Sequence, residues 1–250
     1  KKDRRTAQQQ AKLYADCLEK RYGRRPVIFT SNGYEHWIWD DQAYPPRRIS
    51  GFLKKDELQL LLQRRENVRP LAKVDVDPEI AGRHYQQRAI RRVGEAFERD
   101  AQRKALLVMA TGSGKTRTVV ALIDQLMRAN RVKRVLFLAD RIALVKQAHG
   151  AFKKHLPSTP SANLLERHDT KKNDHAGARV CLSTYPTMMG LIEESKDGEK
   201  RYGPGHFDLI VIDEAHRSVY RKYRAIFEYF DSLLVGLTAT PRDEIDKDTY

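Results

Sequence analysis

The sequence predicts an α/β fold in which a mostly parallel sheet is covered by helices on both faces. From about residue 85 onward, short runs of branched apolar residues alternate with longer amphipathic segments. Runs that are apolar throughout are typical of parallel strands, which are buried on both faces, and the segments between them supply the crossover helices. The expected strands are 105–109, 135–139, 180–183, 209–212 and 234–237.

Three expected helices lie between or before these strands, at 85–99, 116–130 and 143–154. The second has the clearest helical period, because its apolar residues recur every three or four positions, as one buried face requires. These residues are Val119, Leu122, Ile123, Leu126 and Met127. The alternation of helix and strand from residue 80 to residue 250 indicates a domain of its own.

The residues before this region follow a different pattern. A helix is expected over 5–19, with one face formed by Ala7, Ala11, Tyr14, Ala15 and Leu18. Two strand-like runs, 26–30 and 34–39, then flank the pair Asn32-Gly33. An Asn-Gly pair in this position predicts a hairpin with a type I′ turn, which requires a positive φ at both central residues.

A second helix is expected around 56–65, where leucine residues cluster. The stretch that follows it, 68–79, carries Pro70 and Pro78. Because proline interrupts regular structure, we expect this stretch to form a linker before the α/β region.

The composition favours a soluble protein with a polyanionic partner. The 250 residues include 47 Lys and Arg against 33 Asp and Glu, a formal net charge of +14, which points to nucleic acid. Cys17 and Cys181 are far apart, which fits the reducing cytoplasm and argues against a disulfide framework or a zinc site. No apolar run approaches the ~18 residues of a membrane span. Since the first residue is Lys1, we expect the sequence to be a segment of a longer polypeptide.

A phosphate-binding loop is predicted at 110–116, Ala-Thr-Gly-Ser-Gly-Lys-Thr, directly after a strand and at the start of a helix. Glycines let successive main-chain amides wrap around phosphate, and the helix N-terminus adds partial positive charge. Lys115 is expected to reach the β and γ phosphates, and the Thr116 hydroxyl to bind magnesium. Met109 stands where the general pattern has glycine. The remaining nucleotide-binding residues of the loop are Thr111, Gly112, Ser113 and Gly114.

A pair of carboxylates follows the apolar strand 209–212, in the sequence Asp213-Glu214-Ala215-His216. The strand delivers both to its carboxyl end, where ligands collect on parallel sheets. One carboxylate can hold magnesium through water while the next orients the attacking water for in-line displacement. We therefore assign the metal to Asp213 and the catalytic base to Glu214.

The phosphate loop, the Asp-Glu-Ala-His sequence and Thr238-Ala239-Thr240 together resemble the first RecA-like lobe of superfamily 2 helicases. The resemblance implies ATP and magnesium as cofactors, with adenine read by a Q motif at Arg83 and Gln86. It further implies nucleic-acid contacts by Arg141, Gln147 and Thr184. The alternative is that these are ordinary loop residues without a ligand. The residues that the resemblance implies in the coupling of hydrolysis to movement are His216, Thr238 and Thr240.

Residues 8–15 resemble the Gln-x-x-x-Tyr element that ends the nuclease domain of type I restriction enzyme motor subunits. This resemblance places Gln10 and Tyr14 near bound duplex DNA, one helical turn apart. It implies the tail of an α/β nuclease domain over 1–40, a linker with a helix over 41–79 and the first RecA-like lobe over 80–250.

The same resemblance implies methyltransferase and specificity subunits as partners and a cytoplasmic location. It places the nuclease core upstream, and the second lobe with its arginine finger downstream, so this segment alone should hydrolyse ATP weakly and should not cut DNA. A repair or remodelling helicase, or a nucleotide-gated nucleic-acid-binding module, remains an alternative. The intact Asp213-Glu214 pair argues against the gated module, which would not need a hydrolytic base.

Overall fold

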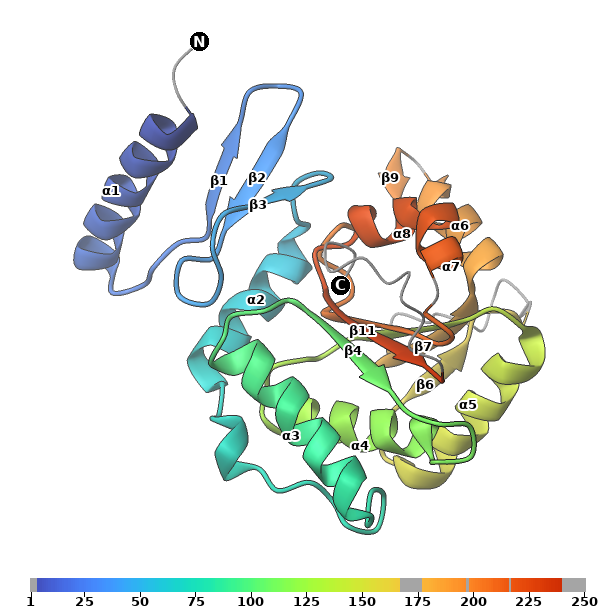
Figure 1. Ribbon diagram of the computed structural model, residues 1–250. Coiled ribbons are helices and arrows are strands. Elements are labelled where there is room, and N and C mark those ends of the chain that lie inside the picture. The colour runs from blue at the N-terminus through green and yellow to red at the C-terminus, as the bar shows by residue number, and fades with distance from the viewer. Residues whose placement is uncertain (1–3, 167–176, 197, 216, 240–250) are drawn as a thin grey trace. The chain divides into compact units, whose positions relative to one another are not determined.

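The computed structural model describes residues 4–166, 177–196, 198–215 and 217–239. The chain divides into two compact units, which span residues 1–53 and 54–250. Figure 1 shows the elements of both units along the chain.

The first unit contains one helix and a three-stranded antiparallel sheet of order β1-β2-β3. Its elements are α1 (Arg4–Tyr22), β1 (Ile28–Ser31), β2 (His36–Trp39) and β3 (Arg47–Ile49). A small apolar core holds them together through Ala15, Ile28, Ile38 and Ile49. The predicted helix and hairpin are confirmed, whereas β3 was not predicted, because a three-residue strand that includes two arginines carries no apolar period.

The turn between β1 and β2 is not the predicted type I′ turn. Gly33 has a φ of 90°, but Asn32 is not among the residues with positive φ. Instead, the Asn32 side-chain oxygen accepts the main-chain N–H groups of Tyr34 at 3.0 Å and Glu35 at 2.7 Å. The asparagine side chain therefore takes the place of a main-chain acceptor and forms an Asx turn, which needs no left-handed asparagine.

The second unit is built on a six-stranded sheet of order β4-β11-β10-β5-β7-β6. All neighbouring strands in it pair in parallel, as predicted. The strands are β4 (Lys104–Val108), β5 (Val135–Ala139), β6 (Ser161–Asn163), β7 (Val180–Thr184), β10 (Leu209–Ile212) and β11 (Leu233–Thr238). Five of these match the predicted apolar runs within one residue at each end, and the unpredicted β6 is short and polar.

Helices cover both faces of this sheet, with α3, α4 and α5 on one side and α6, α7 and α8 on the other (Figure 1). The first three match the predicted helices: α3 (His84–Glu98), α4 (Lys115–Arg128) and α5 (Ile142–His155). The sequence did not predict α6 (Tyr185–Glu193), α7 (Arg217–Lys222) or α8 (Arg224–Tyr229). A short hairpin, β8 (Ser195–Lys196) with β9 (Glu199–Lys200), follows α6.

The segment 68–79, predicted to be a linker, is packed against α4. It follows the predicted helix α2 (Lys55–Asn67) and contains a 3-10 turn, Leu71–Lys73. Gln125 of α4 donates to the Val74 carbonyl at 2.6 Å, and Arg128 donates to the Asp75 carbonyl at 2.7 Å. Prolines stop regular structure here, but main-chain carbonyls outside any helix or strand accept hydrogen bonds from α4 and fix the path of the segment.

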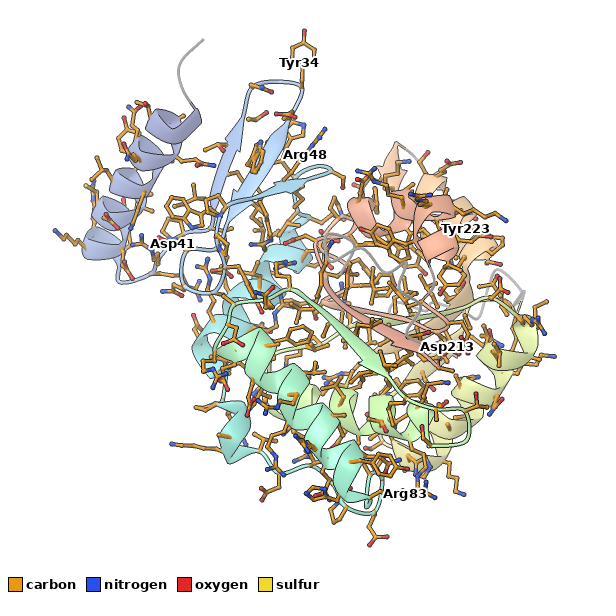
Figure 2. The ribbon with its side chains drawn as sticks, in the orientation of Figure 1. Tyr34, Asp41, Arg48, Arg83, Asp213 and Tyr223 are labelled. Carbon is orange, nitrogen blue, oxygen red and sulfur yellow. The ribbon has the colours of Figure 1, made fainter. Side chains whose placement is uncertain are left out.

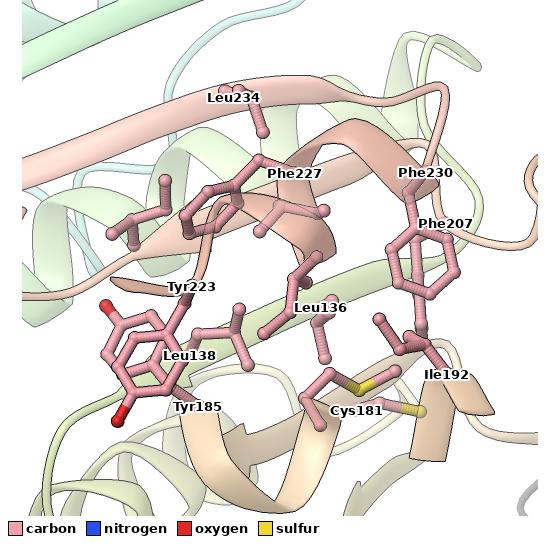
Figure 3. Packing of buried hydrophobic residues seen from close by; sticks show 14 of the residues in the cluster. Leu136, Leu138, Cys181, Tyr185, Ile192, Phe207, Tyr223, Phe227, Phe230 and Leu234 are labelled. Carbon is pink, nitrogen blue, oxygen red and sulfur yellow. The ribbon is translucent and has the colours of Figure 1, made fainter. Parts of the chain in front are cut away.

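The core on the α6–α8 side of the sheet combines aliphatic and aromatic side chains, as Figure 3 shows. Its fully buried members include Tyr185, Ile210 and Ile212, and Tyr223 and Phe230 pack beside them.

In the described part of the chain, no helix is both long and apolar enough to cross a membrane.

Candidate active site

Three neighbouring strands, β4, β11 and β10, bring the predicted motifs to one edge of the sheet. The main-chain N–H of Met109, after β4, donates to the Thr238 carbonyl at 2.9 Å. The N–H of Ala215, after β10, donates to the Leu237 carbonyl of β11 at 2.7 Å. The phosphate loop and the carboxylate pair therefore flank the end of β11, and Figure 2 shows Asp213 at this edge.

The loop that precedes α4 has the backbone that a phosphate site requires. Gly112 and Gly114 have φ values of 78° and 89°, a left-handed conformation that strains residues with a Cβ. Ser113 closes the loop, because its N–H and its hydroxyl both donate to the Ala110 carbonyl, at 3.2 and 2.6 Å. Alternation of glycine with ordinary residues at such angles turns main-chain amides toward one concavity, which suits an anion.

Lys115 is the first residue of α4 and is held close to the loop. Its Nζ donates to the main-chain carbonyl of Met109 at 3.4 Å, a long hydrogen bond. Burial raises the pKa of Asp213, and the positive charge of Lys115 partly opposes this rise. The ammonium group therefore lies beside Met109, where the chain leaves β4 and enters the phosphate loop.

The carboxylates of Asp213 and Glu214 oppose each other electrostatically. Burial raises the pKa of Asp213, the neighbouring Glu214 charge raises it further, and the N–H of Glu214 and the charge of Lys115 act in the other direction. That N–H donates to Asp213 Oδ1 at 3.1 Å. Glu214 has a φ of 53°, which is uncommon for a residue with a side chain and marks stored backbone strain.

Gln86 lies under the phosphate loop instead of projecting from the surface. Its side chain is 3% exposed, and its Nε2 donates to the Ser113 carbonyl at 3.1 Å. The N–H of Arg83 donates to Gln86 Oε1 at 3.3 Å. A Cβ on Gly114 would lie only 2.6 Å from Gln86 Nε2, so this amide packs directly against the loop. Contact of Gln86 with adenine stays a prediction.

Tyr85, which the sequence did not single out, also supports the loop. Its hydroxyl donates to the Ser113 carbonyl at 2.8 Å and accepts a hydrogen bond from Arg83 Nη1 at 2.7 Å. Figure 2 places Arg83 at the beginning of α3. A tyrosine that acts through a main-chain carbonyl 28 residues away leaves no local signal in the sequence.

The residues predicted to contact nucleic acid differ in exposure. Arg141 and Gln147 are exposed, at the N-cap and on the surface of α5. Thr184 is 6% exposed, caps the N-terminus of α6, and shares a hydrogen bond of 3.0 Å with Thr187 through the two hydroxyls. The α5 and α6 N-termini follow the neighbouring strands β5 and β7, so both lie at the carboxyl edge of the sheet.

The remaining predicted residues are scattered. Thr238 is fully buried at the end of β11. His216 and Thr240 lie outside the described residues. In the first unit, Gln10 Nε2 donates to the Tyr14 hydroxyl at 3.0 Å on the exposed face of α1, one turn apart as predicted. The nucleotide residue Thr111 is exposed, and Thr116 lies in the first turn of α4.

Comparison with known proteins agrees with this geometry. Residues 79–243 match the protein family described as "Type III restriction enzyme, res subunit". The chain belongs to this family. The match contains the phosphate loop, the carboxylate pair and all six strands of the parallel sheet.

Among curated proteins, the chain is similar to endonuclease subunits of type I restriction enzymes from Escherichia coli. It is 39% identical to the EcoAI subunit over 165 residues, which cover 64% of the chain and 19% of that protein. It is 33% identical to the EcoKI subunit over 184 residues, which cover 65% and 15%. The chain therefore spans about a fifth or less of the length of these relatives.

Among solved structures, the chain has the fold of the Sulfolobus solfataricus SWI2/SNF2 ATPase core, a structure solved in complex with double-stranded DNA. The TM-score is 0.51 at 20% identity, over 73% of this chain and 36% of that one. At this identity the likeness concerns the fold, and it supports the RecA-like lobe predicted from the motifs.

Proposed function

We propose that this chain binds ATP with magnesium and hydrolyses it as the first motor lobe of a DNA translocase, the endonuclease subunit of a type I restriction enzyme. The observation that carries the proposal is the meeting of three motifs at the carboxyl ends of β4, β11 and β10. One edge of the parallel sheet thus carries a phosphate loop, a carboxylate pair and a buried threonine. Together they form a site for a nucleoside triphosphate.

Each side chain has a part in this scheme. The amides of the loop and the Lys115 ammonium bind the β and γ phosphates, and Gln86 with Arg83 contacts adenine. Thr116 and Asp213 provide the hydroxyl and carboxylate oxygens that suit magnesium, which would neutralise phosphate charge. Glu214 accepts a proton from the attacking water and orients it.

The electrostatics of the site fit a bound cation. Burial and the Glu214 charge raise the pKa of Asp213, so both disfavour its ionised form. A divalent ion beside Asp213 would stabilise its carboxylate and reduce the repulsion between the two side chains. We infer that nucleotide and metal would favour the ionised form of Asp213 beside Glu214.

The partner that we propose is double-stranded DNA. The net charge of +14 favours a polyanion. Arg141, Gln147 and Thr184 would bind the phosphate backbone. In the first unit, Gln10 and Tyr14 would also contact duplex DNA. His216, Thr238 and Thr240 would couple hydrolysis to movement.

The wider assignment follows the relatives. We propose that residues 1–40 end a nuclease domain, that 41–79 connect it to the lobe of 80–250, and that methyltransferase and specificity subunits complete a cytoplasmic complex. A second RecA-like lobe would supply the arginine finger, so this segment alone should hydrolyse ATP weakly.

The test is steady-state ATP hydrolysis by the full-length protein with linear duplex DNA, with single-stranded DNA and without DNA. The Lys115→Ala variant controls for contaminating ATPases. Stimulation by duplex DNA that is lost in the variant is the expected result. Stimulation by single strands alone would favour the strand-separating repair helicase, and no hydrolysis under any condition would contradict the motor and favour a nucleotide-gated binding module.

A further inference from the structure

We infer that Tyr185 positions the Asp213–Glu214 peptide and links the start of α6 to the hydrolysis site. Tyr185 is the first residue of α6, directly after Thr184 at the end of β7. Its hydroxyl donates to the main-chain carbonyl of Asp213 at 2.8 Å. The inference rests on the proposed function, because it assigns a role within the same ATPase site.

The hydrogen bond fixes one particular peptide unit. The peptide between Asp213 and Glu214 carries the carbonyl of the first residue and the N–H of the second. The carbonyl accepts the Tyr185 hydroxyl at 2.8 Å, and the N–H donates to Asp213 Oδ1 at 3.1 Å. Both ends of the peptide are therefore held, one by a tyrosine from another strand–helix junction and the other by the predicted metal-binding carboxylate.

This peptide sets the direction of both carboxylates. Its rotation determines φ of Glu214, which is 53° and therefore strained. A strained angle persists only where surrounding contacts hold it, and the Tyr185 hydrogen bond is such a contact. Without it, the peptide can relax toward a more common angle, and the Glu214 carboxylate would turn away from the attacking water.

Tyr185 is itself rigid. Its side chain is fully buried, and its ring stacks on Tyr223 with centroids 5.0 Å apart and an interplanar angle of 14°. Figure 3 shows the two rings stacked at one end of this apolar core. Because the ring is buried and stacked, we expect a shift of the α6 N-terminus to move the hydroxyl and the peptide that it holds.

The α6 N-terminus and the loop after β5 lie at the edge of the sheet where we place the DNA. Binding of a phosphate backbone at Arg141 and beside the α6 N-terminus would therefore act on the segment that begins with Tyr185. Thr184 is bonded covalently to Tyr185, and the Tyr185 hydroxyl holds the Asp213 carbonyl, so Tyr185 connects the α6 N-terminus to the peptide that precedes Glu214. Tyr185 is thus a positioning residue and touches neither ATP nor metal.

The experiment compares Tyr185→Phe with Tyr229→Phe in the full-length protein. Tyr185→Phe removes the hydroxyl and keeps the stacked ring. Tyr229 is a matched control, because its hydroxyl also donates to a main-chain carbonyl, that of Tyr202 at 2.6 Å, and its ring packs against the same apolar core. The two variants lose the same kind of hydrogen bond, and only the first loses a bond to Asp213.

With saturating duplex DNA, we expect Tyr185→Phe to lower kcat for ATP hydrolysis about tenfold relative to Tyr229→Phe, with KM for ATP within about twofold. The DNA-free rate should fall less, so that stimulation by DNA decreases. The melting temperatures of the two variants should agree, which excludes a general loss of stability.

Equal kcat values for the two variants, or a change in KM alone, would overturn the role of Tyr185. If wild type hydrolyses ATP but the variants do not differ, only this inference fails. If wild type does not hydrolyse ATP at all, the proposed function fails and this inference fails with it.

Discussion

The two edges of the parallel sheet use charged residues in opposite ways. At the amino edge, Asp208 before β10 accepts the main-chain N–H groups of Lys133 at 2.7 Å and Arg134 at 2.9 Å. Its carboxylate also pairs with Arg64 of α2. At the carboxyl edge, Asp213 and Glu214 repel each other, and Lys115 reaches a main-chain carbonyl by a long hydrogen bond.

This contrast indicates that the charged residues of the amino edge stabilise the fold, whereas those of the carboxyl edge serve function. The Asp208 carboxylate is held by two amides and a guanidinium, and it ties the start of β5 to β10 and α2. Two adjacent carboxylates beside a loop of glycines cost stability, and a cation with phosphate would relieve that cost. Substitutions at the carboxyl edge should therefore change ATP hydrolysis or binding, and substitutions at the amino edge should change the free energy of unfolding.

The largest expected effect is at the carboxyl edge. Glu214→Gln keeps the shape of the side chain but removes the base that takes the proton from water, so ATP hydrolysis should fall about a thousandfold. Binding of ATP, measured by equilibrium titration, should stay near the wild-type value. The control is Glu199→Gln, which changes an exposed carboxylate on β9. Normal turnover in Glu214→Gln would show that the base is another residue.

At the amino edge, Asp208→Ala should lower the free energy of unfolding by about 3 kcal/mol. The substitution leaves two main-chain N–H groups and the largely buried Arg64 without their carboxylate acceptor. Urea unfolding measures the loss, and the ATP affinity of the folded fraction should not change. A loss of affinity without a loss of stability would contradict the separation of the two edges.

A smaller effect should appear on lowering the pH. Burial, and next the charge of Arg134, lower the pKa of His206 to about 3, and Arg134 Nη1 lies 3.2 Å from its Nδ1. The unfolded chain binds a proton near pH 6.5, so the stability from neutral His206 is complete above that pH and is lost as the pH falls toward 3.

Between about pH 7.5 and pH 5.5, wild type should lose about 1.4 kcal/mol more unfolding free energy than His206→Gln. The comparison with the variant removes the contributions of His149 and His155, whose pKa values are also lowered by burial. Identical pH dependence in the two proteins would mean that His206 is not held neutral at this edge.

Much of the fold followed from the sequence, because the central strands are apolar along their whole length. The runs at Val135–Ala139 and Leu209–Ile212 were predicted with their observed bounds. The phosphate loop and the carboxylate pair were recognisable because their chemistry needs fixed residue types at fixed local spacing. Their positions on either side of β11 could not be predicted, because they depend on the strand order, which local sequence does not reveal.

The contacts that the sequence did not reveal are those between distant main-chain and side-chain atoms. The hydroxyls of Tyr85 and Tyr185 each donate to a carbonyl 28 residues away, and any residue type could supply such an acceptor. The Asn32 turn was mispredicted for a related reason, since the asparagine side chain satisfied the amides instead of the main chain. Only the three-dimensional structure shows where a side-chain oxygen accepts a hydrogen bond in place of a main-chain carbonyl.

We propose above all that the carboxyl edge of the sheet binds a nucleoside triphosphate through Lys115. The most direct measurement is equilibrium binding of ATP with magnesium to wild type, Lys115→Ala and Lys153→Ala, the last being an exposed lysine at the end of α5. We expect Lys115→Ala to weaken binding at least about tenfold, since a charge-assisted contact to phosphate is lost, and Lys153→Ala to match wild type. Equal affinity for all three proteins would contradict the assignment of the site.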